Sequence, residues 1–293
     1  YKDETVYQRI MDGMNFWYVH RAALVNPGYF MNEITVPGLF LDILLLLGEE
    51  PPRHVLAFVV SRLDPVRDSN DVGANLPWRQ LNHLKLAVLE NDLEGIQRVY
   101  DRVNEEFRLA PELQKEQWRH QRWRSYVRLN LPYGPVEGIQ VDYSFHQHGP
   151  LLYSGPSYGK GFVVESSRLA YVDEEGQFFS AQSLRNLVDL ILEGQQWMVW
   201  KNEFDYSATG RAIAMSNGAD ASFLPIVVQR LLKIKDVPRK DELLALYEAL
   251  TRYGGPTVVG NRYYWKSDYM VHRREDYYAS VRTTSKHAVA TEI

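Results

Sequence analysis

The apolar residues of this chain recur at helical spacing, in segments that come in pairs joined by short loops. The segment that begins at Leu76 is followed by residues 92–107, and residues 224–234 are followed by residues 241–252. Two antiparallel helices joined by a short loop bury their apolar faces against neighbouring pairs. The pattern therefore predicts an all-α fold, an α-toroid in which helix hairpins surround a cleft.

The remaining segments fit the same architecture. Residues 4–24, 52–63, 160–171 and 180–200 also have helical patterns. Pro37 stands where another helix would begin and Gly48 where it would end. Because no Pro- or Ser-rich linker divides the chain, we predict a single domain over residues 1–293.

Composition excludes several classes of protein. The chain has 293 residues, no Cys and a net charge of −4, so it forms no disulfide and lacks the basic excess of a general nucleic-acid binder. No run approaches the eighteen or so apolar residues that a membrane helix needs. The chain begins with Tyr and shows no leader, so either a signal peptide was removed or the chain is a fragment.

Residues 142–159, DYSFHQHGPLLYSGPSYG, combine two His and three Tyr with several Gly and Pro. Gly and Pro at this density break helices and indicate an ordered loop. A loop that presents imidazoles and phenols from a rigid scaffold is suited to proton transfer. The alternative is an aromatic surface loop whose His side chains make ordinary hydrogen bonds.

The run SFHQHGP, followed by SYG, resembles the catalytic loop of polysaccharide lyase family 8, which contains the chondroitin, hyaluronan and xanthan lyases. Four further stretches occur in the same order along the chain as in the family. An aromatic pair before NEI and then VGAN precede the loop, and TGRAIAM and the C-terminal segment come after it. The resemblance implies an incomplete (α/α) toroid followed by β-sandwich domains. Because the chain stops near where those domains would begin, we expect them to be absent from it.

The resemblance also implies a catalytic set, which consists of Asn75, His148, Tyr158, Arg211 and Glu292. In a β-elimination a base removes the proton at C5 of a uronate, and the neighbouring carboxylate must be neutralised by preorganised donors. Asn75 and His148 are the expected donors. Tyrosine, with a reference pKa of about 10, needs a nearby cation such as Arg211 to act as the base. Glu292 is expected to orient His148 or Arg211.

Several assignments stay open at this point. The spacing from His148 to Tyr158 is one residue longer than in the family, so Tyr153 is a competing base and otherwise a substrate contact. Asn75 could instead serve as a helix N-cap. Where the family carries a second Arg, four residues after Arg211, this chain has Met215. Three aromatic residues are expected to bind substrate: Tyr29, Phe30 and Trp78. Tyr29 and Phe30 could instead cover the next helix end.

By this resemblance the chain is a secreted or periplasmic lyase that needs neither metal nor organic cofactor. Its expected substrate is an acidic polysaccharide, chondroitin or hyaluronan, and its product a 4,5-unsaturated uronate. A glycoside hydrolase on a similar toroid is an alternative, and it would need two facing carboxylates, for which Asp142 and Asp205 are the best candidates. A non-catalytic polysaccharide-binding protein is the other alternative.

Overall fold

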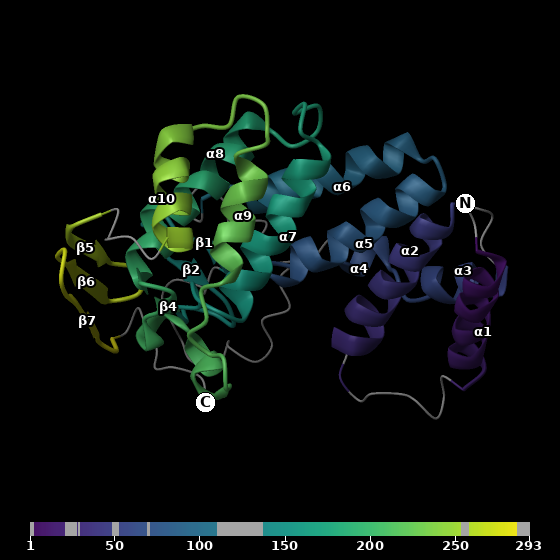
Figure 1. Cartoon of the computed structure of the whole chain (residues 1–293), viewed down its shortest axis with the longest axis horizontal. Helices are drawn as coiled ribbons and strands as arrows, with labels where there is room; N and C mark the ends of the chain where they lie inside the picture. Colours follow the sequence, from purple (N-terminus) through teal and green to yellow (C-terminus); the bar gives the residue numbers. More distant parts are fainter. Residues whose placement is uncertain are drawn as a thin grey trace. The chain divides into compact units, whose positions relative to one another are not determined.

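The computed structural model of the chain describes residues 3–20, 28, 30–48, 53–68, 71–109, 137–252 and 258–285. These residues are mostly helical, as predicted. They divide into two compact units (Figure 1). The first unit comprises Tyr1–Asn70 and Trp78–Tyr100, and the second comprises Asp71–Pro77 and Asp101–Ile293.

The first unit is built from helices around one apolar core. Its elements are α1 (Glu4–His20), the π-helical turn η1 (Met31–Thr35), α2 (Val36–Leu47), α3 (Arg53–Val60), α4 (Pro65–Asp68), most of α5 (Asn75–Leu89) and the start of α6 (Leu93–Glu106). The core is formed by Met14, Phe40, Leu41, Leu44, Val55, Phe58, Val59 and Leu63. Pro37 lies in the first turn of α2, and Gly48 caps it in the left-handed conformation, as predicted.

Helices also form most of the second unit. They are the end of α6, α7 (Tyr158–Val172), α8 (Ala181–Asp189), α9 (Phe223–Leu231) and α10 (Lys240–Arg252). In Figure 1, α9 lies between α7 and α10, and it packs against both. Among the described residues of the chain, no helix is long and apolar enough to cross a membrane.

The predicted helix over residues 180–200 is confirmed from Ala181 to Met198, but it is α-helical only at its start. After α8 the chain passes through a π-helical turn, η5 (Leu190–Gly194), and a 3₁₀ turn, η6 (Gln195–Met198). A side chain at Gly194 would lie 2.3 Å from the carbonyl oxygen of Tyr143, so glycine permits this close approach. The hydroxyl of Tyr264 donates to the carbonyl oxygens of Glu193 and Gly194 at 2.8 and 3.1 Å. The α-helical hydrogen-bonding pattern therefore changes where the chain packs against two other segments.

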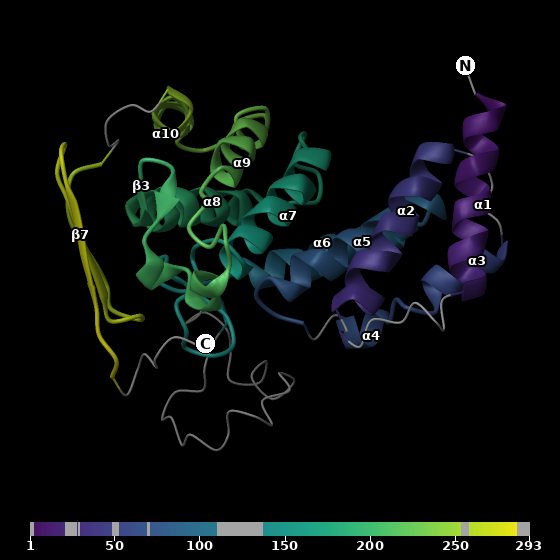
Figure 2. The same cartoon turned by 60° about the horizontal axis from the view of Figure 1, so that its bottom comes forward.

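The all-α prediction also needs correction, because the second unit contains three small antiparallel sheets. They pair β1 (Gly138–Ile139) with β2 (Phe145–His146), β3 (Val199–Trp200) with β4 (Glu203–Phe204), and β5 (Gly260–Tyr264) with β6 (Tyr269–Arg273) and β7 (Tyr278–Arg282). Burial alternates along β5 and β6, as expected for strands with one covered face. Figure 2 shows the three-stranded sheet edge-on, in yellow.

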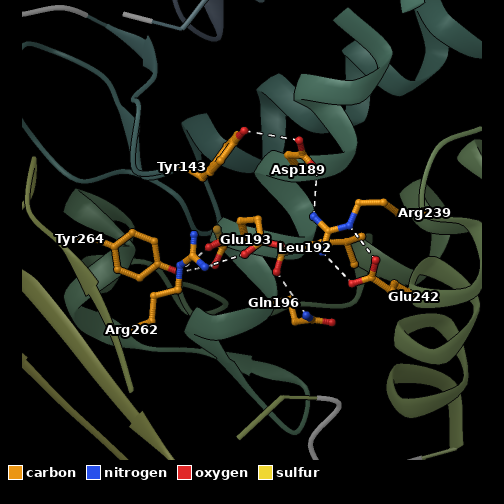
Figure 3. A network of polar contacts seen from close by, with 10 residues as sticks. Tyr143, Asp189, Leu192, Glu193, Gln196, Arg239, Glu242, Arg262 and Tyr264 are labelled. Carbon is orange, nitrogen blue, oxygen red and sulfur yellow. Dashed lines mark hydrogen bonds and ion pairs between the residues drawn. The ribbon is translucent and has the colours of Figure 1, made fainter. Parts of the chain in front are cut away.

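A network of ion pairs fastens β5 to the helices of the second unit (Figure 3). Glu193 of η5 pairs with Arg262 of β5 and with Arg239, each at 2.5 Å. Arg239 also binds Asp189 at 2.8 Å and Glu242 at 2.6 Å. Glu193 thus receives two guanidinium groups from segments on either side of it.

Replacing this shared carboxylate tests the network. Glu193→Gln is expected to lower the free energy of unfolding by about 1 kcal/mol, because these partly exposed pairs are screened by water. Urea titration measures the loss, and added salt should shrink it. The matched control is Glu175→Gln, whose carboxylate makes an exposed pair with Lys235 at 3.2 Å. An equal loss in both variants would contradict a special role for Glu193.

Candidate active site

Two segments that are far apart in the sequence meet at the centre of the second unit. The amide of Gly155 donates to the carbonyl oxygen of Ala208 at 2.9 Å, which aligns residues 153–158 with residues 208–211. The Arg211 guanidinium donates a very short hydrogen bond to the Tyr158 hydroxyl and lies 5.1 Å from the centre of its ring. The amide of Arg211 donates to the Tyr153 hydroxyl at 3.3 Å. One arginine therefore contacts both tyrosines.

His148 completes this aromatic group. Its ring lies edge-on to Tyr158, with ring centres 4.8 Å apart, and 6.0 Å from the ring of Tyr153. The two tyrosine rings are 5.2 Å apart and nearly perpendicular. His148 has a φ of 57°, an uncommon left-handed conformation for a non-glycine residue. The structure thus places an imidazole, two phenols and a guanidinium in contact with one another.

Glycines make this packing possible. Gly210 has a φ of +56°, and a Cβ there would lie 2.0 Å from Cε1 of Tyr153. A Cβ on Gly159 would lie 2.3 Å from the carbonyl oxygen of Ser154. Glycine is therefore required both before Arg211 and after Tyr158, which gives a physical reason for the TGR and SYG runs.

The residue before Asn75 is hydrogen-bonded to the loop that carries His148. The Ala74 amide donates to Oε1 of the Gln147 side chain at 2.8 Å. This bond joins the residue before Asn75 to the residue before His148. Asn75 is the first residue of α5, and because assigned helix ends vary by one or two residues, the N-cap role stays a prediction beside the catalytic one.

Burial separates the two competing tyrosines. Tyr153 is 0% exposed and Tyr158 is 7% exposed. A base must touch its substrate, and a fully covered ring has no surface with which to do so. Because part of its surface is exposed, Tyr158 is the better candidate for the base.

The first histidine of the HQH run differs from the second. His146 is buried, and its Nε2 lies 2.8 Å from the Ser267 hydroxyl of the turn between β5 and β6. Burial, helped by Arg282 and Lys266, lowers the pKa of His146 to about 3. It is therefore a neutral structural residue that ties the loop to the sheet.

Both carboxylates considered for a hydrolase also make structural contacts. Asp142 is 2% exposed and accepts from the Ser144 amide and hydroxyl with one oxygen and from the Lys266 amide with the other. Asp205 accepts from the Ser207 amide and from the hydroxyls of Tyr269 and Tyr278. These acceptors fasten the loops rather than face each other across a substrate.

The other predicted site residues lie elsewhere. Phe30 and Trp78, in the first unit, form an edge-on pair with ring centres 5.0 Å apart. Tyr29 and Glu292 lie outside the described residues. Within the described part of the chain, no three His, Cys, Asp or Glu side chains are grouped to hold a metal ion.

Comparison with known proteins identifies the family. Residues 129–250 match the polysaccharide lyase family 8 N-terminal alpha-helical domain, and residues 259–293 match the super-sandwich domain of the same family. Together these matches cover more than half of the chain. The chain belongs to polysaccharide lyase family 8. Strands β5, β6 and β7 fall within the super-sandwich match.

Individual relatives are distant in sequence and similar in fold. Chondroitinase-AC of Pedobacter heparinus is 22% identical over 298 residues, which is all of this chain and 39% of that protein. A chondroitinase AC lyase solved as an enzyme–oligosaccharide complex matches 98% of this chain and 40% of its own, at 21% identity and a TM-score of 0.75. A xanthan lyase of Paenibacillus matches 99% of this chain and 29% of its own, at 14% identity and a TM-score of 0.71. The chain thus spans about two fifths of the length of the curated relative.

The glycine before Arg211 provides a test of the site geometry. Gly210→Ala is expected to lower turnover by about 10²-fold, because the new methyl group displaces either Tyr153 or Arg211. The control is Gly176→Ala, which has a φ of +71° and nothing within 4 Å of the added Cβ. Both substitutions strain a backbone at positive φ, but only the one at Gly210 also brings a methyl group against Tyr153. Steady-state kinetics on the two variants separates these effects, and equal turnover in both would contradict this account.

Proposed function

We propose that the protein is a lyase that cleaves a uronate-containing polysaccharide by β-elimination. The observation that carries the proposal is the hydrogen bond from Arg211 to the Tyr158 hydroxyl, made directly beside the His148 ring. A phenol paired with a permanent cation and an imidazole is suited to moving a proton from carbon to oxygen.

In the proposed reaction Tyr158, as its phenolate, takes the proton from C5 of the uronate. The electron pair of that C–H bond forms the C4–C5 double bond, and the bond from C4 to the glycosidic oxygen breaks. Tyr158 then returns the proton to the leaving oxygen. Arg211 stabilises the phenolate before the proton is taken, at no cost in reorganisation because it already contacts the hydroxyl.

Asn75 and His148 are proposed to bind the uronate carboxylate. As the C5 proton leaves, negative charge spreads onto that carboxylate, and donors fixed in advance lower the barrier. The left-handed backbone at His148 and the bond between Ala74 and Gln147 hold the segments that carry these two side chains. We propose that Glu292 orients His148 or Arg211, as the resemblance implies.

Tyr153 is assigned a positioning role. Its hydroxyl accepts from the Arg211 amide, and its ring packs against Gly210 and Tyr158. It fixes the main chain from which the Arg211 side chain extends. The reaction as written needs neither metal nor organic cofactor.

The substrate proposal comes from the relatives. Chondroitin AC lyases and a xanthan lyase share the fold, so an acidic polysaccharide is the proposed class and chondroitin or hyaluronan the first polymers to test. We further propose that the helix pairs belong to an incomplete (α/α) toroid, that residues 1–293 work as one catalytic domain, and that the protein acts outside the cytoplasm, where such polymers occur.

Substituting the proposed base tests the reaction. The full-length protein should raise ultraviolet absorbance when it acts on chondroitin or hyaluronan, because elimination creates a conjugated double bond. Tyr158→Phe is expected to lower turnover by at least about 10²–10⁴-fold while oligosaccharide binding persists. Tyr153→Phe, the matched control, should lose far less, because it removes a main-chain contact of Arg211 and leaves the Tyr158 hydroxyl in place.

Other outcomes have definite meanings. Saturated products with new reducing ends would replace the lyase with a hydrolase. Binding of a uronate polymer without any cleavage would indicate a non-catalytic binder. Full activity in Tyr158→Phe would remove that residue from the base role.

The aromatic pair of the first unit is proposed to stack on a sugar ring. Phe30 is 38% exposed, and Arg79, next to Trp78, binds Asp68 and Glu33 at 2.8 and 3.0 Å. These ion pairs hold the start of α5 against η1, where the two rings meet. Trp78→Ala is expected to raise KM up to about 10-fold with a smaller change in kcat, since aromatic stacking is worth about 0.5–1.5 kcal/mol. Isothermal titration with oligosaccharides measures the loss, and unchanged KM would contradict the assignment.

A further inference from the structure

A half-buried carboxylate lies behind the candidate site, on a residue that none of the site motifs includes. Glu137 immediately precedes β1, and its Oε2 accepts from the Gln147 side-chain amide. Its Oε1 accepts from the Gly149 amide at 3.3 Å. Glu137 thus receives hydrogen bonds from the residues on both sides of His148.

Gln147 passes this contact on to a second loop. Its Nε2 donates to Glu137, and its Oε1 accepts from the Ala74 amide. Gly73 has a φ of +59°, and a Cβ there would lie 2.3 Å from Oε1 of Gln147, so a glycine is needed for the approach. The chain of bonds therefore runs from the loop before Asn75, through Gln147, to Glu137 and back to the main chain after His148.

We propose that Glu137 is a positioning residue, which through Gln147 and the Gly149 amide holds the His148 and Asn75 loops in one fixed arrangement. The inference rests on the proposed function for its kinetic readout. The hydrogen bonds that link Glu137 to Gln147 and to the Gly149 amide, called the bridge below, can be tested without activity. Glu137 does not touch substrate in this account. It acts through the two donors proposed for the uronate carboxylate.

Backbone strain explains why such an acceptor is needed. His148 and Gly149 have φ values of 57° and 93°, and a non-glycine residue at positive φ is strained unless its surroundings hold it. Hydrogen bonds to an ionised carboxylate are stronger than those between neutral groups. In its ionised form Glu137 is therefore suited to keep His148 in its strained conformation.

A second carboxylate supports the other loop. Glu106 of α6 accepts from the Gly73 amide at 2.6 Å and from Arg102 at 3.1 Å, and Arg102 also donates to the Asp71 carbonyl oxygen. Among the residues that the structure describes, the charges of Glu106 and Asp71 act on Glu137, and Arg102 acts in turn on Glu106. Burial, with Glu106 and Asp71 adding to it, raises the pKa of Glu137 to about 8.

As the pH rises, the contribution of Glu137 to stability and the turnover of the enzyme should change in opposite directions. Because the folded pKa of Glu137 lies above its unfolded value, its contribution to stability is present below pH 4.5 and lost as the pH rises through about 8. The described hydrogen bonds of Glu137 come from N–H donors, on Gln147 and Gly149, so the carboxylate form is the one that fits them. Turnover should therefore rise as the pH rises towards 8, while the stability contribution of this carboxyl falls.

The experiment exchanges the two side chains of the bridge in the full-length protein. In Glu137→Gln one side-chain atom becomes a donor, so it faces either the Gln147 amide or the Gly149 amide, both of which are donors. In Gln147→Glu two carboxylates face each other. In the double variant E137Q/Q147E the amide of residue 137 donates to the new carboxylate, and every bond and the net charge are restored.

Each single variant is expected to lose at least 10-fold in kcat with KM changed less than threefold, and the double variant to return to within about threefold of the wild type. The rise of turnover towards pH 8 should also disappear in Glu137→Gln. Glu175→Gln, an exposed residue outside the site, is the control for a lost carboxylate. A double variant that regains stability but not kcat overturns the proposal, as do single variants that keep wild-type kcat.

Hydrogen exchange separates this proposal from the proposed function. The amides of Ala74 and Gly149 should exchange faster in both single variants and regain protection in the double variant, whether or not any polymer is cleaved. If protection is restored but the protein cleaves no uronate polymer, the proposed function is rejected and the positioning role of Glu137 is supported. Unchanged protection in the single variants would reject the bridge. If the single variants do not fold, folding and protection of the double variant decide the matter.

Discussion

The close approach of residues 153–158 to the turn at residues 208–211 is the constraint on which the site depends. The two segments are held by the bond between Gly155 and Ala208, and they can touch only because residue 210 has no side chain. This contact sets the Arg211 guanidinium against the Tyr158 hydroxyl. An ion placed so close to a phenol before substrate arrives needs no rearrangement during the reaction, which is the main physical requirement for stabilising a developing charge.

The two histidines of the HQH run show how one loop divides structural and chemical tasks. His146 points into the protein, where burial keeps it neutral and Ser267 holds it. His148, two residues later, is less buried and lies against Tyr158. Residues i and i+2 of a regular strand face the same side, so strand geometry alone does not separate the two imidazoles, and β2 ends at His146. The positive φ at His148 then turns the chain away.

Sequence patterns predicted some features because those features are local. Helical periodicity, Pro37 and Gly48 located α2. Short motifs singled out His148, Tyr158 and Arg211, which the structure brings into contact. Strands β1 to β4, of two residues each, carry no periodic signal, and the end of α8 depends on Tyr143 and Tyr264, which are distant in sequence. The β5–β7 hairpins did carry alternation, but the strength of the helical pattern elsewhere obscured it. Glu137 was missed because its partners lie in two other loops and only the fold brings them together.

The three-stranded sheet supports both halves of the site, which explains why a helical scaffold alone is not enough. The turn between β5 and β6 holds the histidine loop through Ser267 and Lys266. Arg282 of β7 donates to the Ser207 carbonyl oxygen at 2.8 Å, just before the Arg211 turn. The hydroxyls of Tyr269 and Tyr278 both donate to one oxygen of Asp205. The other oxygen of Asp205 accepts from the Ser207 amide, at the beginning of the segment that leads to Arg211. Imidazole and guanidinium therefore come from helical-domain loops, but their spacing is maintained by strands that follow both in the sequence.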